Sequence, residues 1–96
     1  MTECGFNTAL LHSAASDDPQ GATLTPIYQC SAFQHKNAEE LEQIFANRKP
    51  GFSYTRINNP TVQAFERRMT QLEGGVTSVA CASGMGALTI SLMNLL

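Results

Sequence analysis

The sequence predicts an α/β fold, and three observations support this prediction. Small and apolar residues at 77–81 are typical of a short buried strand, and the chain then turns at Ser83 and Gly84 into a strongly apolar helix. An amphipathic helix is expected just before that strand, from Pro60 onward. Residues 1–60 are mostly polar, which is typical of an extended arm. A chain of 96 residues makes at most one domain.

Composition and charge argue against several classes of protein. A hydrophobic fraction of 43% with 15% charged residues indicates a globular rather than a disordered chain. A net charge of −2 argues against nucleic acid as a partner. No apolar run is long enough for a membrane span and the N-terminus lacks signal-peptide features, so we expect a cytoplasmic protein with no membrane contact. The spacing of Cys4, Cys30 and Cys81 predicts free thiols and no metal site.

The first half of the chain predicts two short helices and one extended segment. Asn7 is a candidate N-cap for a helical stretch through His12. Apolar and polar residues alternate over 26–33 well enough to predict an extended segment. The proline at its start, Pro26, favours an edge strand or an arm that lies on another surface. Asn37 should begin a helix with Glu40 as its capping-box partner. The run Lys49-Pro50-Gly51 should end that helix.

The second half predicts two longer helices on either side of the strand. Asn59 is the expected N-cap of the first, Pro60 its first residue, and Gly74-Gly75 its C-terminal stop. The second begins at Gly84 and is apolar on every side, as in a buried helix. These 96 residues do not supply the sheet that would bury it, so we expect the chain to be a piece of a longer protein.

The turn Ser83-Gly84-Met85 is a candidate anion-binding site. A helix N-terminus presents unpaired N–H groups and a partial positive charge, which suit a phosphate. The turn does not fit a dinucleotide fingerprint, whose third glycine would fall on Thr89, and it lacks the Gly-Lys-Ser/Thr of a Walker loop. Spacing alone leaves a structural alternative open, in which Gly84 and Gly86 permit close packing of the helix on a sheet.

A second candidate for phosphate binding is the pair Tyr54 and Arg56. At spacing i, i+2 in an extended segment, both side chains would project from one face. Arginine offers a planar fork of donors and tyrosine adds a neutral hydroxyl. The alternative is a surface aromatic and a cation near a loop.

Taken in order, four stretches resemble the Cys/Met-metabolism family of pyridoxal-phosphate enzymes, and the resemblance extends over essentially the whole chain. The stretches are Gly21-Ala22 with Pro26-Ile27-Tyr28-Gln29, then Phe52-Ser53-Tyr54-Thr55-Arg56-Ile57-Asn58-Asn59-Pro60-Thr61, then Leu72-Glu73-Gly74-Gly75, and Ala82-Ser83-Gly84-Met85. Residues 46–62 look most like O-acetylhomoserine sulfhydrylases, with cystathionine γ-synthase, cystathionine γ-lyase and methionine γ-lyase as near relatives.

The resemblance implies a fold-type I, aminotransferase-like architecture. Residues 1–59 would form an extended arm with short helices that crosses to a neighbouring subunit of a homo-oligomer. Residues 60–96 would begin the large cofactor-binding α/β domain, which this chain leaves incomplete. The turn Ser83-Gly84-Met85 would hold the phosphate of pyridoxal 5'-phosphate through backbone amides, and Tyr54 and Arg56 would reach the phosphate of the partner subunit's cofactor.

The implied activity is γ-replacement in sulfur amino-acid biosynthesis, in which O-acetylhomoserine and sulfide or a thiol give homocysteine or methionine. The family's Schiff-base lysine and its other catalytic residues lie later in family sequences, so no catalytic residue is assigned and the 96-residue chain alone is expected to be inactive. Three alternatives stay open. They are a fragment of one of the related enzymes, a stand-alone oligomerisation module, and a small phosphate- or nucleotide-binding protein.

Overall fold

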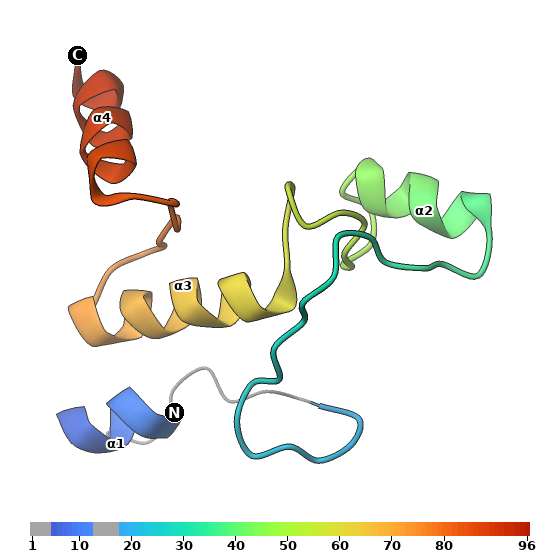
Figure 1. Ribbon diagram of the computed structural model, residues 1–96, viewed down its shortest axis with the longest axis horizontal. Coiled ribbons are helices and arrows are strands. Elements are labelled where there is room, and N and C mark those ends of the chain that lie inside the picture. The colour runs from blue at the N-terminus through green and yellow to red at the C-terminus, as the bar shows by residue number, and fades with distance from the viewer. Residues whose placement is uncertain (1–4, 13–17) are drawn as a thin grey trace. The chain divides into compact units, whose positions relative to one another are not determined.

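The computed structural model describes residues 5–12 and 18–96 (Figure 1). The described elements are four helices, α1 (Phe6–His12), α2 (Ala38–Phe45), α3 (Pro60–Glu73) and α4 (Gly84–Leu95), and one isolated antiparallel bridge between Ala32 and Tyr54. The chain divides into two compact units. One covers Ala14–Ala64, and the other combines Met1–Ser13 with Phe65–Leu96.

The start of α2 confirms the predicted N-cap. The Asn37 side chain accepts a hydrogen bond of 2.8 Å from the Glu40 N–H, which satisfies one of the free donors of the first turn. The reciprocal bond of a capping box, from the Asn37 N–H to the Glu40 carboxylate, is not found among the described residues; that carboxylate accepts a hydrogen bond from Lys49 Nζ at 2.9 Å. Glu40 therefore ties the beginning of α2 to the loop that follows the helix.

The end of α2 comes earlier than the sequence predicts. Asn47 adopts a left-handed conformation with φ of 57°, and the Arg48 N–H donates to the Gln43 carbonyl at 2.9 Å. This pattern is a Schellman motif, in which asparagine takes the place usually held by glycine. The helix thus ends at Phe45, before the predicted stop at Lys49-Pro50-Gly51.

The unit of residues 14–64 buries very little apolar surface. Among the described residues, Ile44 is the one buried hydrophobic side chain. Gly51 lies against it, since a Cβ atom built on Gly51 would stand 2.8 Å from Ile44 Cδ1 and 3.1 Å from Cγ1. The absence of a side chain at Gly51 therefore allows the post-helix loop to close over Ile44.

Replacing Gly51 with alanine is expected to destabilise the protein by about 1 kcal/mol, the lower end of the cost of overpacking, because the clashing atom is the tip of a flexible side chain. Urea unfolding of the variant and the parent protein measures this difference. Gly5→Ala is a matched control, since a Cβ at Gly5 meets nothing within 4 Å. Equal losses from both substitutions would contradict the packing role of Gly51.

The ion pair of α2 predicts a pH dependence. The hydrogen bond from Lys49 holds the pKa of the Glu40 carboxyl below its ordinary value of 4.5. A carboxyl whose pKa is lowered by folding contributes stability above its unfolded pKa, and this contribution is lost as the pH falls through the folded pKa. In an NMR titration, Lys49→Met should raise the pKa of Glu40. High salt should reduce the difference in the Glu40 pKa between this variant and the parent protein, because salt screens the ion pair. An unchanged pKa in Lys49→Met would show that the pair does not persist in solution.

In the second unit, α1 begins at Phe6, one residue before the predicted cap. Asn7 lies inside the helix, and the Ala9 N–H donates to the Gly5 carbonyl at 3.0 Å, so the prediction that Asn7 is the N-cap is wrong. The helix lies alongside the second half of α3, where Arg68 donates from Nη2 to the Leu11 carbonyl at 3.3 Å (Figure 1).

The limits of α3 agree with the sequence signals. The helix begins at Pro60, and the Asn59 side-chain oxygen accepts a hydrogen bond from the Thr61 N–H at 2.9 Å. It ends at Glu73, after which Gly74 is left-handed with φ of 64° and the Gly75 N–H donates back to the Thr70 carbonyl at 2.9 Å. Both caps are as expected from the sequence.

The segment 77–81 does not form the predicted strand within the described part of the chain. It is held along α3 by side chains instead. The Ala80 N–H donates to the Glu66 carboxylate at 2.8 Å, and the Ser78 and Thr70 hydroxyls are 2.7 Å apart. A strand is defined by hydrogen bonds to a neighbouring strand, and no described residue provides such a neighbour for this segment.

The sequence prediction for α4 is confirmed in its position and its apolar surface. The helix starts at Gly84, and none of its residues is buried. Its large side chains are exposed, from Leu95 at 81% to Leu88 at 58%. None of the helices in the described ranges combines the length and the hydropathy that crossing a membrane requires.

Candidate functional site

The loop that carries Tyr54 and Arg56 is anchored on the extended segment 26–33. Tyr54 forms an antiparallel bridge with Ala32, the Phe33 N–H donates to the Ser53 carbonyl at 3.1 Å, and the Thr55 N–H donates to the Ser31 carbonyl at 2.8 Å. Two stretches of backbone more than twenty residues apart in sequence are thus held side by side.

After Tyr54 the backbone turns, so the predicted extended conformation at 54–56 is wrong. The N–H groups of Ile57 and Asn58 both donate to the Tyr54 carbonyl at 3.0 Å. The structure still brings the two predicted side chains together, since the Arg56 guanidinium carbon lies 5.7 Å from the centre of the Tyr54 ring. This distance is within the range of a cation–π contact. Both side chains are exposed, which leaves their polar groups accessible to a ligand.

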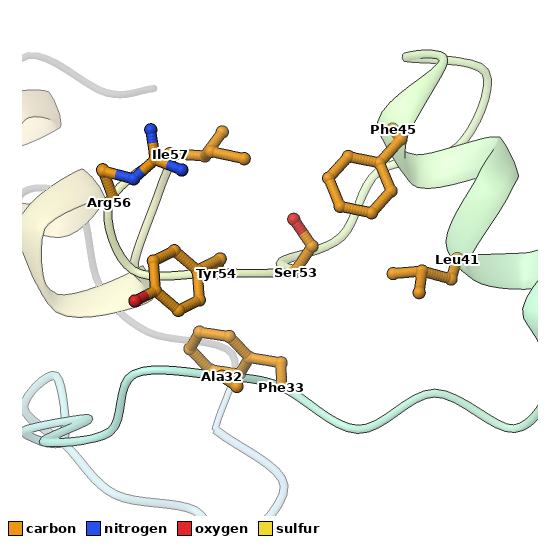
Figure 2. A pocket seen from close by; sticks show the side chains of 8 residues that line it. All are labelled: Ala32, Phe33, Leu41, Phe45, Ser53, Tyr54, Arg56 and Ile57. Atoms are coloured by element: carbon orange, nitrogen blue, oxygen red, sulfur yellow. The ribbon is translucent and has the colours of Figure 1, made fainter.

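Beside this pair lies an open hollow of about 440 Å³. Figure 2 shows Leu41 and Phe45 reaching toward it from α2, with Tyr54 and Arg56 at the opposite side. The complete lining consists of Ala32, Phe33, Leu41, Phe45, Ser53, Tyr54, Arg56 and Ile57. An apolar hollow bordered by one guanidinium and one phenol suits a ligand or a protein segment that carries a negative charge at one end.

Asn59 is a residue whose wider role the sequence did not reveal. Its side chain is 3% exposed, and it is the one buried polar residue among those described. Besides capping α3, it donates from Nδ2 to the Tyr28 carbonyl at 3.0 Å and to Thr55 Oγ1 at 3.1 Å. The signal in the sequence is an N-cap asparagine, whose amide nitrogen remains available for a second partner.

The second predicted cluster lies at the start of α4. Ser83 is the N-cap in an extended conformation, and its Oγ accepts a hydrogen bond of 3.0 Å from the Gly86 N–H. Within the described residues, the N–H groups of Gly84 and Met85 have no hydrogen-bond acceptor. Two backbone donors at the positive end of a 12-residue helix are therefore open to an anion.

The two glycines of this turn have different roles. A Cβ at Gly86 would stand 3.1 Å from Ser83 Oγ, so this glycine makes room for the capping side chain. A Cβ at Gly84 would meet nothing within 4 Å, so Gly84 faces open space. The close approach at Gly86 is therefore to the capping side chain and not to a sheet, which was the structural alternative, whereas Gly84 leaves a clear approach to the open N–H groups.

The two clusters belong to different units, Tyr54 and Arg56 to one and Ser83, Gly84 and Met85 to the other. Each offers donors, and the contacts of the described residues that form each cluster involve no carboxylate that would repel an anion. Neither cluster contains a lysine, and the Lys49 amine is paired with Glu40. The arrangement can bind and orient an anionic group.

Comparison with known proteins matches residues 7–96 to the family described as Cys/Met metabolism PLP-dependent enzymes. The chain is 46% identical over 92 residues to an O-acetyl-L-homoserine sulfhydrylase from Corynebacterium glutamicum, covering 95% of this chain and 21% of the relative. It is 43% identical over 95 residues to an L-methionine gamma-lyase from Pseudomonas putida, covering 96% of this chain and 23% of the relative.

A solved structure from Campylobacter jejuni, assigned as an O-acetylhomoserine (thiol)-lyase and carrying a pyridoxyl-lysine monophosphate, superimposes with a TM-score of 0.86 at 33% identity. The match covers 96% of this chain and 23% of that chain. The chain thus spans about a fifth of the length of the relatives it matches. The similarity confirms the predicted fold class, the N-terminal part of a fold-type I domain.

Proposed function

Because the chain belongs to the Cys/Met metabolism family of PLP-dependent enzymes, we propose that it is the N-terminal part of a γ-replacement enzyme that replaces the acetoxy group of O-acetylhomoserine with sulfide or a thiol and releases acetate. The products would be homocysteine or methionine. The observation that carries this proposal is the identity to the Corynebacterium sulfhydrylase over nearly the whole chain. The similarity to the Pseudomonas lyase supports a second candidate, the breakdown of L-methionine.

In this proposal, the residues of the chain bind the cofactor phosphate. The open N–H groups of Gly84 and Met85 hold the phosphate of pyridoxal 5'-phosphate, and Ser83 fixes the turn from which they point. When bound, pyridoxal phosphate supplies an electron sink that favours proton removal from the substrate. The residues fit the group, because a dianionic phosphate requires several donors in open space and the start of α4 provides two.

Tyr54 and Arg56 are proposed to bind the same phosphate from a neighbouring subunit. This assignment rests on their exposure and on the contact between the guanidinium and the phenol ring, which presents two kinds of donor together. It makes residues 1–59 an arm exchanged between copies in a homo-oligomer and residues 60–96 the start of the cofactor domain. Cytoplasmic localisation stays a prediction.

The experiment that tests this function uses the full-length enzyme with pyridoxal phosphate. Incubation with O-acetylhomoserine and sulfide should give homocysteine, measured by a thiol-specific assay after separation. Incubation with L-methionine alone should release far less methanethiol. The reverse preference would support the lyase, and no reaction with either substrate would overturn the proposed function.

The 96-residue chain by itself is expected to show no turnover. Its two lysines are Lys36 and Lys49, and neither belongs to the two clusters proposed to bind the cofactor phosphate. The Lys49 Nζ is instead 2.9 Å from the Glu40 carboxylate, to which it donates a hydrogen bond. Purified chain mixed with pyridoxal phosphate should give no stoichiometric adduct after borohydride reduction and no sulfhydrylase activity. A reduced adduct at Lys36 or Lys49 that accompanies turnover would contradict this prediction.

A further inference from the structure

The side chain of Asn59 connects three separate backbone segments. Its Oδ1 accepts from the Thr61 N–H at 2.9 Å, and its Nδ2 donates both to the Tyr28 carbonyl at 3.0 Å and to Thr55 Oγ1 at 3.1 Å. The start of α3, the extended segment 26–33 and the loop of Tyr54 and Arg56 therefore meet at one buried amide. A buried amide with all these partners fixes a single arrangement of the segments it joins.

Thr55 carries this constraint into the loop. Its hydroxyl accepts from Asn59 and donates to the Cys30 carbonyl, so the Thr55 side chain faces segment 26–33. Thr55 stands between Tyr54 and Arg56 in the chain. While the Thr55 side chain is held toward that segment, the side chains of Tyr54 and Arg56 contact each other. Figure 2 shows the Arg56 guanidinium above the Tyr54 ring.

We propose that Asn59 is a positioning residue for phosphate binding, acting through Thr55 to hold Tyr54 and Arg56 in one arrangement before the ligand arrives. This inference rests on the proposed function, since it assumes that the pair binds the cofactor phosphate. Arginine and tyrosine side chains lose rotamer freedom when they bind, and a loop that is already ordered reduces that cost. In the described part of the chain the Asn59 side chain makes no hydrogen bond to the side chain of Tyr54 or Arg56, so its effect passes through Thr55 and the backbone of the loop.

The alternative is that Asn59 only stabilises the fold, and a ratio of two affinities separates the two roles. Pyridoxal 5'-phosphate and pyridoxal differ only in the phosphate, so the ratio of their dissociation constants reports phosphate binding alone. The measurement is titration of full-length apoenzyme with each compound, followed by absorbance. A purely structural role changes both dissociation constants together, whereas a positioning role changes their ratio.

Three variants carry the test. Asn59→Ser keeps a helix-capping oxygen but removes the amide donor. Thr55→Val removes the hydroxyl at an exposed position where loss of folding is not expected. The control is Thr61→Val, because the Thr61 hydroxyl joins α3 to segment 26–33 by accepting from the Tyr28 N–H at 2.9 Å and donating to the Pro26 carbonyl at 2.8 Å, without touching the loop.

Asn59→Ser and Thr55→Val should each weaken binding of pyridoxal phosphate by about 3- to 10-fold, the effect of a neutral hydrogen bond, with pyridoxal unchanged. Thr61→Val should lower the melting temperature and keep the ratio. In an Arg56→Ala background, Asn59→Ser should cause little further loss, because both substitutions act through the same contact.

Equal weakening of both compounds in Asn59→Ser and Thr55→Val would overturn the positioning role. If Asn59→Ser does not fold, Thr55→Val decides the question alone. A change of ratio in Thr61→Val as large as in Thr55→Val would also overturn it, since the effect would then follow general loosening of the arm. Failure of the proposed function looks different, because Arg56→Ala itself would then leave the ratio unchanged.

Discussion

Arg56→Ala in the full-length enzyme is expected to weaken binding of pyridoxal phosphate by about 1.5 to 3 kcal/mol, which is about 10- to 150-fold. The guanidinium is the one cation of the pair with Tyr54, and it is exposed and available to a phosphate. Hydrogen bonds between charged groups are about twice as strong as neutral ones, and arginine forms two in parallel. Equilibrium titration of the apoenzyme measures the loss.

The matched control for this prediction is Arg67→Ala. It removes the same charge from an exposed position on α3, outside the loop of Tyr54. Arg56→Lys should recover part of the affinity, because an ammonium keeps the charge but loses the planar fork. Unchanged affinity in Arg56→Ala, or an equal loss in Arg67→Ala, would refute the assignment of Arg56.

Helix ends were the most predictable part of this fold, because they depend on a few neighbouring residues. Asn37, Pro60 and Gly74 each act as the sequence indicates. Asn47 was missed, although asparagine is the residue that most readily replaces glycine in a left-handed C-cap. The error at Asn7 has the same origin, since several residues at the start of a short helix can serve as its boundary.

Features that depend on distant partners were harder to predict. Residues 77–81 have the composition of a strand, but pairing requires a neighbouring strand that local sequence does not specify. Asn59 is separated in sequence from Tyr28 by 31 residues and from Thr55 by 4. The local sequence signals predict only that Asn59 caps α3, and they do not predict these two hydrogen bonds.

The candidate site shows both kinds of outcome. The side chains of Tyr54 and Arg56 lie together as the sequence predicts, but the predicted extended backbone is wrong, because the loop turns after Tyr54. The start of α4 was predictable in detail, because Ser83 and Gly84 form a cap within a few residues. What separates the roles of Gly84 and Gly86 is the space around each, which only the structure provides.

The 96-residue chain is expected to self-associate through residues 79–96, and this is the largest effect that the structure predicts. The large apolar side chains of α4 and of the segment before it are more than half exposed, namely Val79, Met85, Leu88, Ile90, Leu92, Met93 and Leu95. Burying one such side chain contributes roughly 1.5 to 3 kcal/mol, and contiguous apolar patches above a few hundred Å² are rare on monomers.

Association costs about 4 to 15 kcal/mol in lost freedom, so burial of a few of these side chains on each copy is enough to offset it. Sedimentation equilibrium at micromolar concentrations should therefore give a mass above that of one chain. Charges on one face of α4, introduced by Leu88→Glu with Leu92→Glu, should shift the equilibrium toward monomer, whereas Leu24→Glu, outside α4, should not. A well-folded monomer with Leu88 and Leu92 shielded inside one chain would contradict the prediction, because these side chains would then have a cover that their present exposure excludes.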